Sequence, residues 1–172
     1  DLIRTTDTAG KVSNMPSNKI MSAFLKKGNG EENTVSNEKV PSLKQVLNKF
    51  KGDILFDIDV KNESDRQSLI SFIHENNFQD FVDVKKPLEN ISEAKAYIDM
   101  ESQSKIIRMI VLNITNQSKD EISQIIDLTD PEIVEINFSD VSVLREVLNI
   151  CQKRDISVWV NTLDGVSNGG FT

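Results

Sequence analysis

The residues with the clearest chemical potential lie in one short stretch, from Lys51 to Lys61. Between Ile54 and Lys61 polar and apolar residues largely alternate, and alternate residues of a β-strand point to opposite faces. Asp57, Asp59 and Lys61 therefore share one face of the predicted strand, and the other face is apolar. Charges on a strand with an apolar back are costly unless they pair or bind a ligand. The stretch predicts either an Asp59–Lys61 ion pair or a metal or phosphate site.

The composition limits the classes of function. The chain has 172 residues, 38% hydrophobic and 27% charged, which is typical of a soluble globular domain with a real core. Its formal net charge of −7 argues against broad binding to nucleic acid or to anionic membranes. If such an acidic protein binds a phosphate, local lysines or arginines or a divalent cation must offset the repulsion between the negative charges. The single Cys151 excludes an internal disulfide and a thiolate metal cluster.

The first part of the chain, to about residue 40, is polar and rich in Gly, Asn and Ser. A short helical pattern covers residues 20–25, and a flexible loop is expected at 26–37. A helix is predicted to open at Pro41–Ser42, because the apolar residues that follow are spaced as on one helix face. These are Leu43, Val46, Leu47 and Phe50.

Beyond this helix, predicted strands and helices alternate. Strands are expected at 54–61, 81–85, 106–114, 133–138 and 156–161, and helices at 64–77, 92–100, 120–128 and 140–153, with Asp140 as a helix N-cap. Five successive strand–helix units predict an α/β fold with a parallel sheet, either doubly wound or closed as a barrel. No Gly-rich fingerprint follows any of these strands, which weakens a dinucleotide-binding interpretation.

Polar residues recur where the predicted strands end. On both parallel architectures the carboxyl edge of the sheet is where ligands bind, so the pattern predicts a binding site there. The residues concerned are Asp59, Lys61, Lys85, Glu135, Asn137, Trp159 and Asn161.

Several short motifs, in order along the chain, resemble the glycerophosphodiester phosphodiesterase family. They are Leu2-Ile3-Arg4-Thr5-Thr6, Gly10-Lys11-Val12, Val40-Pro41-Ser42-Leu43-Lys44-Gln45-Val46-Leu47, Asp59-Val60-Lys61, Glu135-Ile136-Asn137-Phe138 and Val160-Asn161-Thr162. The family's own versions include Leu-x-Arg-Thr-Thr, Val-Pro-Thr-Leu-Glu-Glu-Val-Leu and a strand ending Glu-x-Lys. The likeness covers nearly the whole chain.

The resemblance implies a (β/α)₈ TIM-type barrel that hydrolyses phosphodiesters with a divalent metal, Ca²⁺ or Mg²⁺, and two histidines. Residues 1–172 would form one barrel domain that begins after the second strand and ends after the seventh. We therefore expect an incomplete barrel of about five β-α units, which lacks the first two strands and the last. The family's catalytic histidines would precede Asp1, so the resemblance assigns no catalytic residue in this chain.

The resemblance also suggests site residues. Asp59 would be a metal ligand in place of the family's usual Glu, one methylene shorter, and calcium tolerates varied oxygen geometry better than magnesium. Lys61, Lys85, Glu135, Trp159 and Asn161 would contact the substrate, although the family has Thr where Trp159 stands.

Several of these residues also have a purely structural interpretation. Asp57 fits a buried structural acid, Lys85 a surface salt bridge, and Glu135 an internal ion pair. His74, the only histidine, lies within a predicted helix beside apolar residues and is interpreted as structural. Cys151 is expected to be a buried, inert thiol.

Phosphodiester cleavage needs a proton donor and a positioned nucleophile, and no predicted strand end carries a histidine. Carboxylates or lysines would need unusual pKa values to substitute. The leading hypothesis is therefore metal-dependent hydrolysis of a small-molecule phosphodiester, such as a glycerophosphodiester, by an intact parent protein. By resemblance, that parent would be a bacterial enzyme of lipid metabolism with no nucleic acid partner. The sequence does not determine its localisation, and a periplasmic or extracytoplasmic location is compatible with the resemblance. The alternative is a non-catalytic ligand-binding or structural module of the same barrel architecture.

Overall fold

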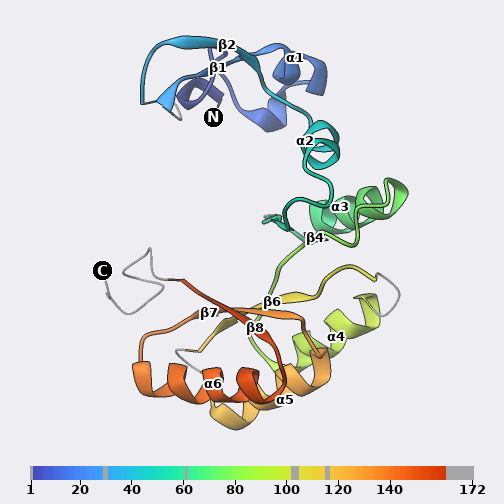
Figure 1. The fold of residues 1–172 in the computed structure, drawn as a ribbon, viewed down its shortest axis with the longest axis vertical. Coiled ribbons are helices and arrows are strands. Elements are labelled where there is room, and N and C mark those ends of the chain that lie inside the picture. Colours follow the sequence, from blue (N-terminus) through green and yellow to red (C-terminus); the bar gives the residue numbers. More distant parts are fainter. Residues whose placement is uncertain (1, 29–30, 61, 102–104, 115–116, 162–172) are drawn as a thin grey trace. The chain divides into compact units, whose positions relative to one another are not determined.

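The computed structural model describes residues 2–28, 31–60, 62–101, 105–114 and 117–161 (Figure 1). The chain forms two compact units, Asp1–Lys51 and Gly52–Thr172, and each is described by itself. That both belong to one barrel domain stays a prediction. No helix among the described residues is long and apolar enough to cross a membrane.

The N-terminal unit is built around a small antiparallel pair of strands. Its elements are η1 (Leu2–Arg4), η2 (Val12–Asn14), α1 (Ser17–Ser22), β1 (Phe24–Lys26), β2 (Val35–Lys39) and α2 (Leu43–Lys49). In the pairing of β1 with β2, Phe24 lies opposite Lys39 and Lys26 opposite Val35.

Two predictions for this unit are wrong. The helix expected at 20–25 lies earlier, at Ser17–Ser22, and the loop expected at 26–37 contains the start of β2. A helix of one or two turns is marginal by itself, whereas pairing β1 with β2 satisfies backbone groups along both segments.

Helix α2 confirms the predicted opening at Ser42. The Ser42 hydroxyl accepts a hydrogen bond from the backbone N–H of Gln45 at 3.2 Å, and the Gln45 side-chain oxygen accepts one from the Ser42 N–H at 2.8 Å. This reciprocal pair is a capping box, which satisfies two N–H groups that the first turn would leave unpaired.

The C-terminal unit alternates strands and helices, as the sequence predicted. In order it contains β3 (Phe56–Asp57), α3 (Glu63–Glu75), β4 (Val82–Asp83), β5 (Lys86–Leu88), α4 (Ile91–Glu101), β6 (Met109–Asn113), α5 (Lys119–Thr129), β7 (Ile133–Asn137), α6 (Val141–Lys153) and β8 (Ser157–Val160). Asp140 caps α6, because its carboxylate accepts a hydrogen bond of 2.7 Å from the Ser142 N–H. All four helices predicted in this unit are confirmed within a few residues.

The strands of this unit are parallel. β3 pairs with β4, and β5, β6, β7 and β8 form one sheet in sequence order. A parallel bridge between Asp83 and Ile107 has the same offset as the pair Lys86 and Ile110. The segment that contains β4 and β5 therefore runs parallel to residues 107–112, in one continuous register.

Two predicted strands are shorter than expected. The strand expected at 54–61 is reduced to Phe56–Asp57, and β3 is paired only with β4 among the described strands, so one of its edges has no ladder there. The strand expected at 81–85 gives way to β4 and β5, with a break between them. At the break the Val84 carbonyl accepts a hydrogen bond from the Arg66 guanidinium at 3.4 Å.

Helices α4, α5 and α6 all lie along one face of the sheet β5–β8 (Figure 1). Each of the three helices joins two neighbouring parallel strands, and together they bury one core with the even-numbered strand residues. A doubly wound sheet has helices on both faces, whereas a barrel has them only outside. The unit is thus a mixed α/β fold in which α4, α5 and α6 lie on one side of the parallel sheet β5–β8. The described strands do not close a barrel, so a barrel stays a prediction.

The one-sided core gives a stability prediction. Ile136 on β7 is fully buried in it, and Leu128 on α5 is 40% exposed. We expect Ile136→Ala to lower the free energy of unfolding by about 2–5 kcal/mol, because the cavity cannot be filled by solvent or by collapse. Urea denaturation followed by circular dichroism measures it. Leu128→Ala is the matched control, and an equal loss in both variants would contradict this assignment of the core.

Candidate functional site

Lys85 lies at the centre of a polar cluster in the C-terminal unit. Its ammonium nitrogen is 3.3 Å from Asp57 Oδ2 and 3.0 Å from Glu135 Oε2. The three side chains come from β3, the break between β4 and β5, and β7, so residues far apart in sequence meet here. All three are between 14% and 19% exposed, which makes the cluster largely but not fully enclosed.

The cluster occupies the sheet face that the helices leave uncovered. Val134 and Ile136 point into the helix-covered core, so Glu135 between them points to the opposite face. The strand alternation therefore separates an apolar face from a charged one within the same sheet.

Asp83 adds a second carboxyl group beside Asp57. The two residues are direct partners in the β3–β4 pairing, so their side chains lie on the same face. Asp83 is fully buried. Among the described residues, neither of its carboxylate oxygens has a hydrogen-bond donor, and the buried Asp57 Oδ1 has none either. A proton held between the two carboxyl groups would satisfy an oxygen on each.

The electrostatics agree with this arrangement. Burial, followed by the nearby Asp57 carboxylate, raises the pKa of Asp83 to about 8. Burial opposes the charge of Lys85, but the hydrogen bond from its ammonium to Glu135 and the nearby Asp57 outweigh it and raise the Lys85 pKa. At neutral pH Asp83 is therefore mostly protonated and Lys85 is charged, which leaves the four groups with a net charge of about −1.

Within the part of the chain that the structure describes, the Lys85 ammonium has one N–H donor that Asp57 and Glu135 do not occupy. A lysine has three N–H donors, and Asp57 and Glu135 take two of them. The remaining donor can reach an anionic oxygen, but the net negative charge of the cluster repels a free anion. A phosphate would approach only if a further cation came with it.

The structure brings together two of the predicted substrate-contacting residues, Lys85 and Glu135. Trp159 on β8 pairs with Glu135 in the sheet, so it shares the uncovered face, where it is 44% exposed. Asn161 follows β8, and its backbone N–H donates to the Ile136 carbonyl at 3.1 Å. Asn137, also noted in the sequence, has a buried side-chain oxygen with no donor in the described part of the chain.

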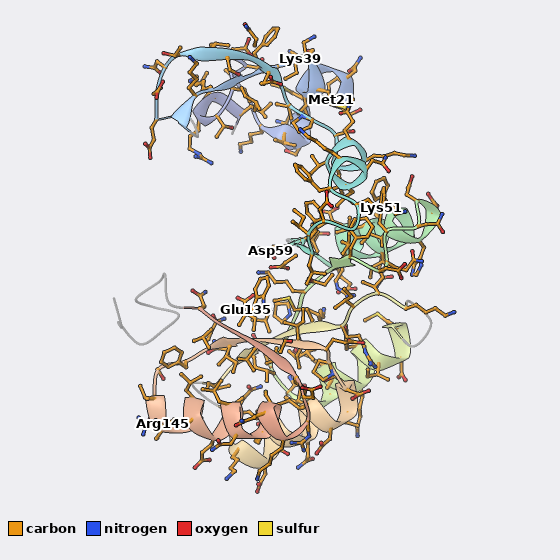
Figure 2. All side chains as sticks on the ribbon, viewed as in Figure 1. Met21, Lys39, Lys51, Asp59, Glu135 and Arg145 are labelled. Carbon is orange, nitrogen blue, oxygen red and sulfur yellow. The ribbon has the colours of Figure 1, made fainter. Side chains whose placement is uncertain are left out.

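The predicted metal ligand is placed less favourably. Asp59 lies two residues beyond β3 and is exposed rather than part of the strand; Figure 2 labels it and Glu135. Lys61 lies outside the described residues. In the described ranges no three histidine, cysteine, aspartate or glutamate side chains are grouped to hold a metal. These residues therefore do not form a metal site by themselves, and the metal-ligand role of Asp59 stays a prediction.

Sequence reasoning missed Asp83. A signal was present, because Asp83-Val84-Lys85 repeats the pattern Asp59-Val60-Lys61 at the end of the next predicted strand. Asp57, interpreted from the sequence as a buried structural acid, is largely enclosed and forms an ion pair with Lys85, which is consistent with that interpretation. Cys151 is fully buried as predicted, and His74 lies in the last turn of α3.

Comparisons with known proteins found limited similarity. No protein-family model matches the sequence, and no curated protein matches it. Among solved structures, the chain is similar to a glycerophosphodiester phosphodiesterase from Parabacteroides distasonis, at 14% identity and a TM-score of 0.49, over 89% of this chain and 60% of that one. It is also similar to MenC from Desulfotalea psychrophila, at 13% identity and a TM-score of 0.41, over 70% and 43% of the two chains.

The chain thus spans less than two thirds of either structure. Neither identity is high enough to transfer the role of a residue to this chain.

The Asp57–Asp83 pair predicts a pH dependence of stability. The pKa of Asp83 is about 8 in the folded chain and about 4 in the unfolded one, so the folded state binds more protons between these values. Stability from this group is full below about pH 4 and is lost as the pH rises through 8. Asp83→Asn cannot ionise, so its stability relative to the wild type should grow by on the order of 3–5 kcal/mol between pH 5 and pH 9.

Urea denaturation at pH 5, 7 and 9 measures this difference. Asp80→Asn, at an exposed position of the same unit, is the control and should keep the pH dependence of the wild type. The wild type and the Asp83→Asn variant could instead lose stability equally steeply between pH 7 and 9. That result would show that Asp83 is not protonated at neutral pH.

Proposed function

We propose that this chain forms part of a phosphodiesterase site whose substrate is a small phosphodiester, such as a glycerophosphodiester. Lys85 would contact a non-bridging phosphate oxygen, and Asp59 would supply one ligand to a divalent metal ion, Ca²⁺ or Mg²⁺. The proposal assigns the other metal ligands and the catalytic histidines to no residue of this chain. Hydrolysis would release an alcohol and a phosphomonoester.

The observation that carries this proposal is the environment of Lys85. Its ammonium is held by Asp57 and Glu135 on the uncovered face of a parallel sheet, and these two carboxylates leave its third N–H donor unoccupied. A lysine is a compact point charge, which suits a phosphate oxygen. The ordered family-like motifs of the sequence, among them Asp59-Val60-Lys61, support the same class of substrate.

The charge balance supports the need for a metal in such a site. The cluster around Lys85 is net negative, and a phosphodiester adds another negative charge. One divalent cation would offset both, and an exposed carboxylate such as Asp59 is a suitable hard oxygen ligand. This role is assigned to Asp59 by resemblance, and Lys61 is proposed as a second phosphate contact on the same basis.

The competing hypothesis is a non-catalytic module of the same architecture. It is favoured by His74, since the only histidine of the sequence lies in the last turn of helix α3 and is not among the residues of the polar cluster. The two hypotheses differ in one assay. The natural protein that carries this chain, freed of metal by a chelator, is incubated with a panel of glycerophosphodiesters with and without added Ca²⁺ or Mg²⁺. Metal-dependent release of a phosphomonoester supports the enzyme, and no release supports the module.

A metal prediction follows for Asp59. Added Ca²⁺ or Mg²⁺ should raise the melting temperature of the natural protein, because a ligand that binds only the folded state stabilises it. Asp59→Asn keeps the size of the side chain and removes its charge, so it should reduce this rise and lower turnover. Asp53→Asn, at an exposed position nearby, is the control. An equal metal response in the wild type and Asp59→Asn would remove Asp59 from the ligand set.

A second prediction separates the possible roles of Lys85. If its ammonium contacts the phosphoryl group mainly as charge develops in the transition state, Lys85→Met should lower kcat more than it raises KM. If it serves only as the ion-pair partner of Asp57 and Glu135, the variant should lose stability, by about 3 kcal/mol, and keep its activity per folded molecule. Turnover normalised to the folded fraction, with exposed Lys95→Met as control, distinguishes the two.

The same measurement applies to Lys61. A folded Lys61→Met protein with unchanged turnover would end the proposed phosphate contact of Lys61.

A further inference from the structure

The N-terminal unit differs sharply in charge from the rest of the chain. Residues 1–51 contain nine lysines and arginines against five aspartates and glutamates, a formal net charge of +4. Residues 52–172 contain eleven against twenty-two, a formal net charge of −11. The whole-chain value of −7 therefore conceals a basic unit, which attracts anions at its own surface.

This basic unit contains a groove with a volume of about 700 Å³. It lies between α1, β1, the end of β2 and α2. Its lining includes the apolar residues Met21, Leu25, Val40, Pro41, Val46 and Phe50. Met21 is 38% exposed and Phe50 is 36% exposed, so the apolar lining is open to solvent. The volume lies within the usual range of small-molecule sites.

Two lysines border this groove. Lys39 is the last residue of β2 and Lys49 is the last residue of α2. Figure 2 shows Lys39 near Met21 of α1. Each ammonium lies 5.4 Å from the centre of a phenylalanine ring, that of Phe24 for Lys39 and that of Phe50 for Lys49. Within the described part of the chain neither lysine forms an ion pair with a carboxylate.

Glu38 and Gln45 complete the polar part of the lining. The groove therefore carries two positive charges and one negative charge around an apolar surface. An apolar groove bordered by lysines, whose long stems can bend their charged heads to a rim, fits a molecule with an alkyl chain and an anionic head. A purely apolar ligand would leave the lysines without partners, and a hydrophilic anion would leave the apolar surface in water.

We propose that this groove binds a single-chain anionic amphiphile, with its alkyl chain against Met21, Val46 and Phe50 and its head group between the Lys39 and Lys49 ammoniums. The complementarity of charge and the apolar lining select this occupant. The site belongs to the N-terminal unit alone, so it does not depend on the proposed phosphodiesterase site and can be tested apart from it.

The test uses the 172-residue chain and dodecyl phosphate below its micelle-forming concentration, with binding measured by isothermal titration calorimetry. We expect one molecule bound per chain. Dodecyltrimethylammonium, which has the same chain and a positive head, should bind at least about tenfold more weakly, because the lysines repel it. Phosphatidylglycerol vesicles form a separate arm, which detects binding to a charged surface rather than to the groove.

Variants locate the site. Lys39→Glu/Lys49→Glu should weaken dodecyl phosphate binding by at least about tenfold, since two favourable charge contacts become repulsive. Lys11→Glu/Lys44→Glu makes the same change of net charge at exposed lysines outside the groove and should have a smaller effect. Met21→Gln tests the apolar contact, with Val12→Gln as its control, because Val12 is 54% exposed and does not line the groove.

Several results would overturn the proposal. They are an absence of binding by monomeric dodecyl phosphate, binding to the anionic vesicles only, and equal losses of affinity in the groove variants and their controls. Circular dichroism of each variant confirms that it is folded before its affinity is compared.

Discussion

The structure of the C-terminal unit depends on one constraint: the three helices that connect β5 to β8 all cover the same face of that parallel sheet. α4, α5 and α6 bury the even-numbered residues of β5 to β8, as Val134 and Ile136 show on β7. Because strand side chains alternate, Glu135 and Trp159 are directed to the other face. The same feature that makes the core apolar on one side therefore gathers polar groups on the other.

Charged groups on that second face remain there because they are paired. Lys85 is held between Asp57 and Glu135, and Asp83 is buried against Asp57 with a pKa of about 8. Had Asp83 been ionised at neutral pH, three carboxylates would surround one ammonium at low exposure, and the desolvation cost would be severe. Because Asp83 retains its proton, only two carboxylates are charged and the desolvation cost is lower. Part of the stability of the unit thereby becomes sensitive to pH within the physiological range.

The two units of the chain suit different ligands. The C-terminal unit carries a net charge of −11 and needs a cation before it can hold a phosphate, whereas the N-terminal unit carries +4 and offers an open apolar groove with lysines at its border. Both proposals concern molecules with an anionic phosphate-like head, but they rest on separate residues. The acidic total charge, which argued against binding to anionic surfaces, describes the average of two unlike parts.

The sequence by itself determined the helices α2 to α6, the parallel order of the strands in the C-terminal unit and part of the site. The spacing of apolar residues located α2 to α6, and polar residues at strand ends singled out Lys85 and Glu135, because both signals depend on neighbours a few positions away. It did not find β1, β5 or the length of β3, since short strands exist only through their partners. Only the tertiary structure decided between winding on one face and on two, and only it revealed the buried Asp83 beside Asp57. Those outcomes depend on contacts between residues more than twenty positions apart, which no local pattern encodes.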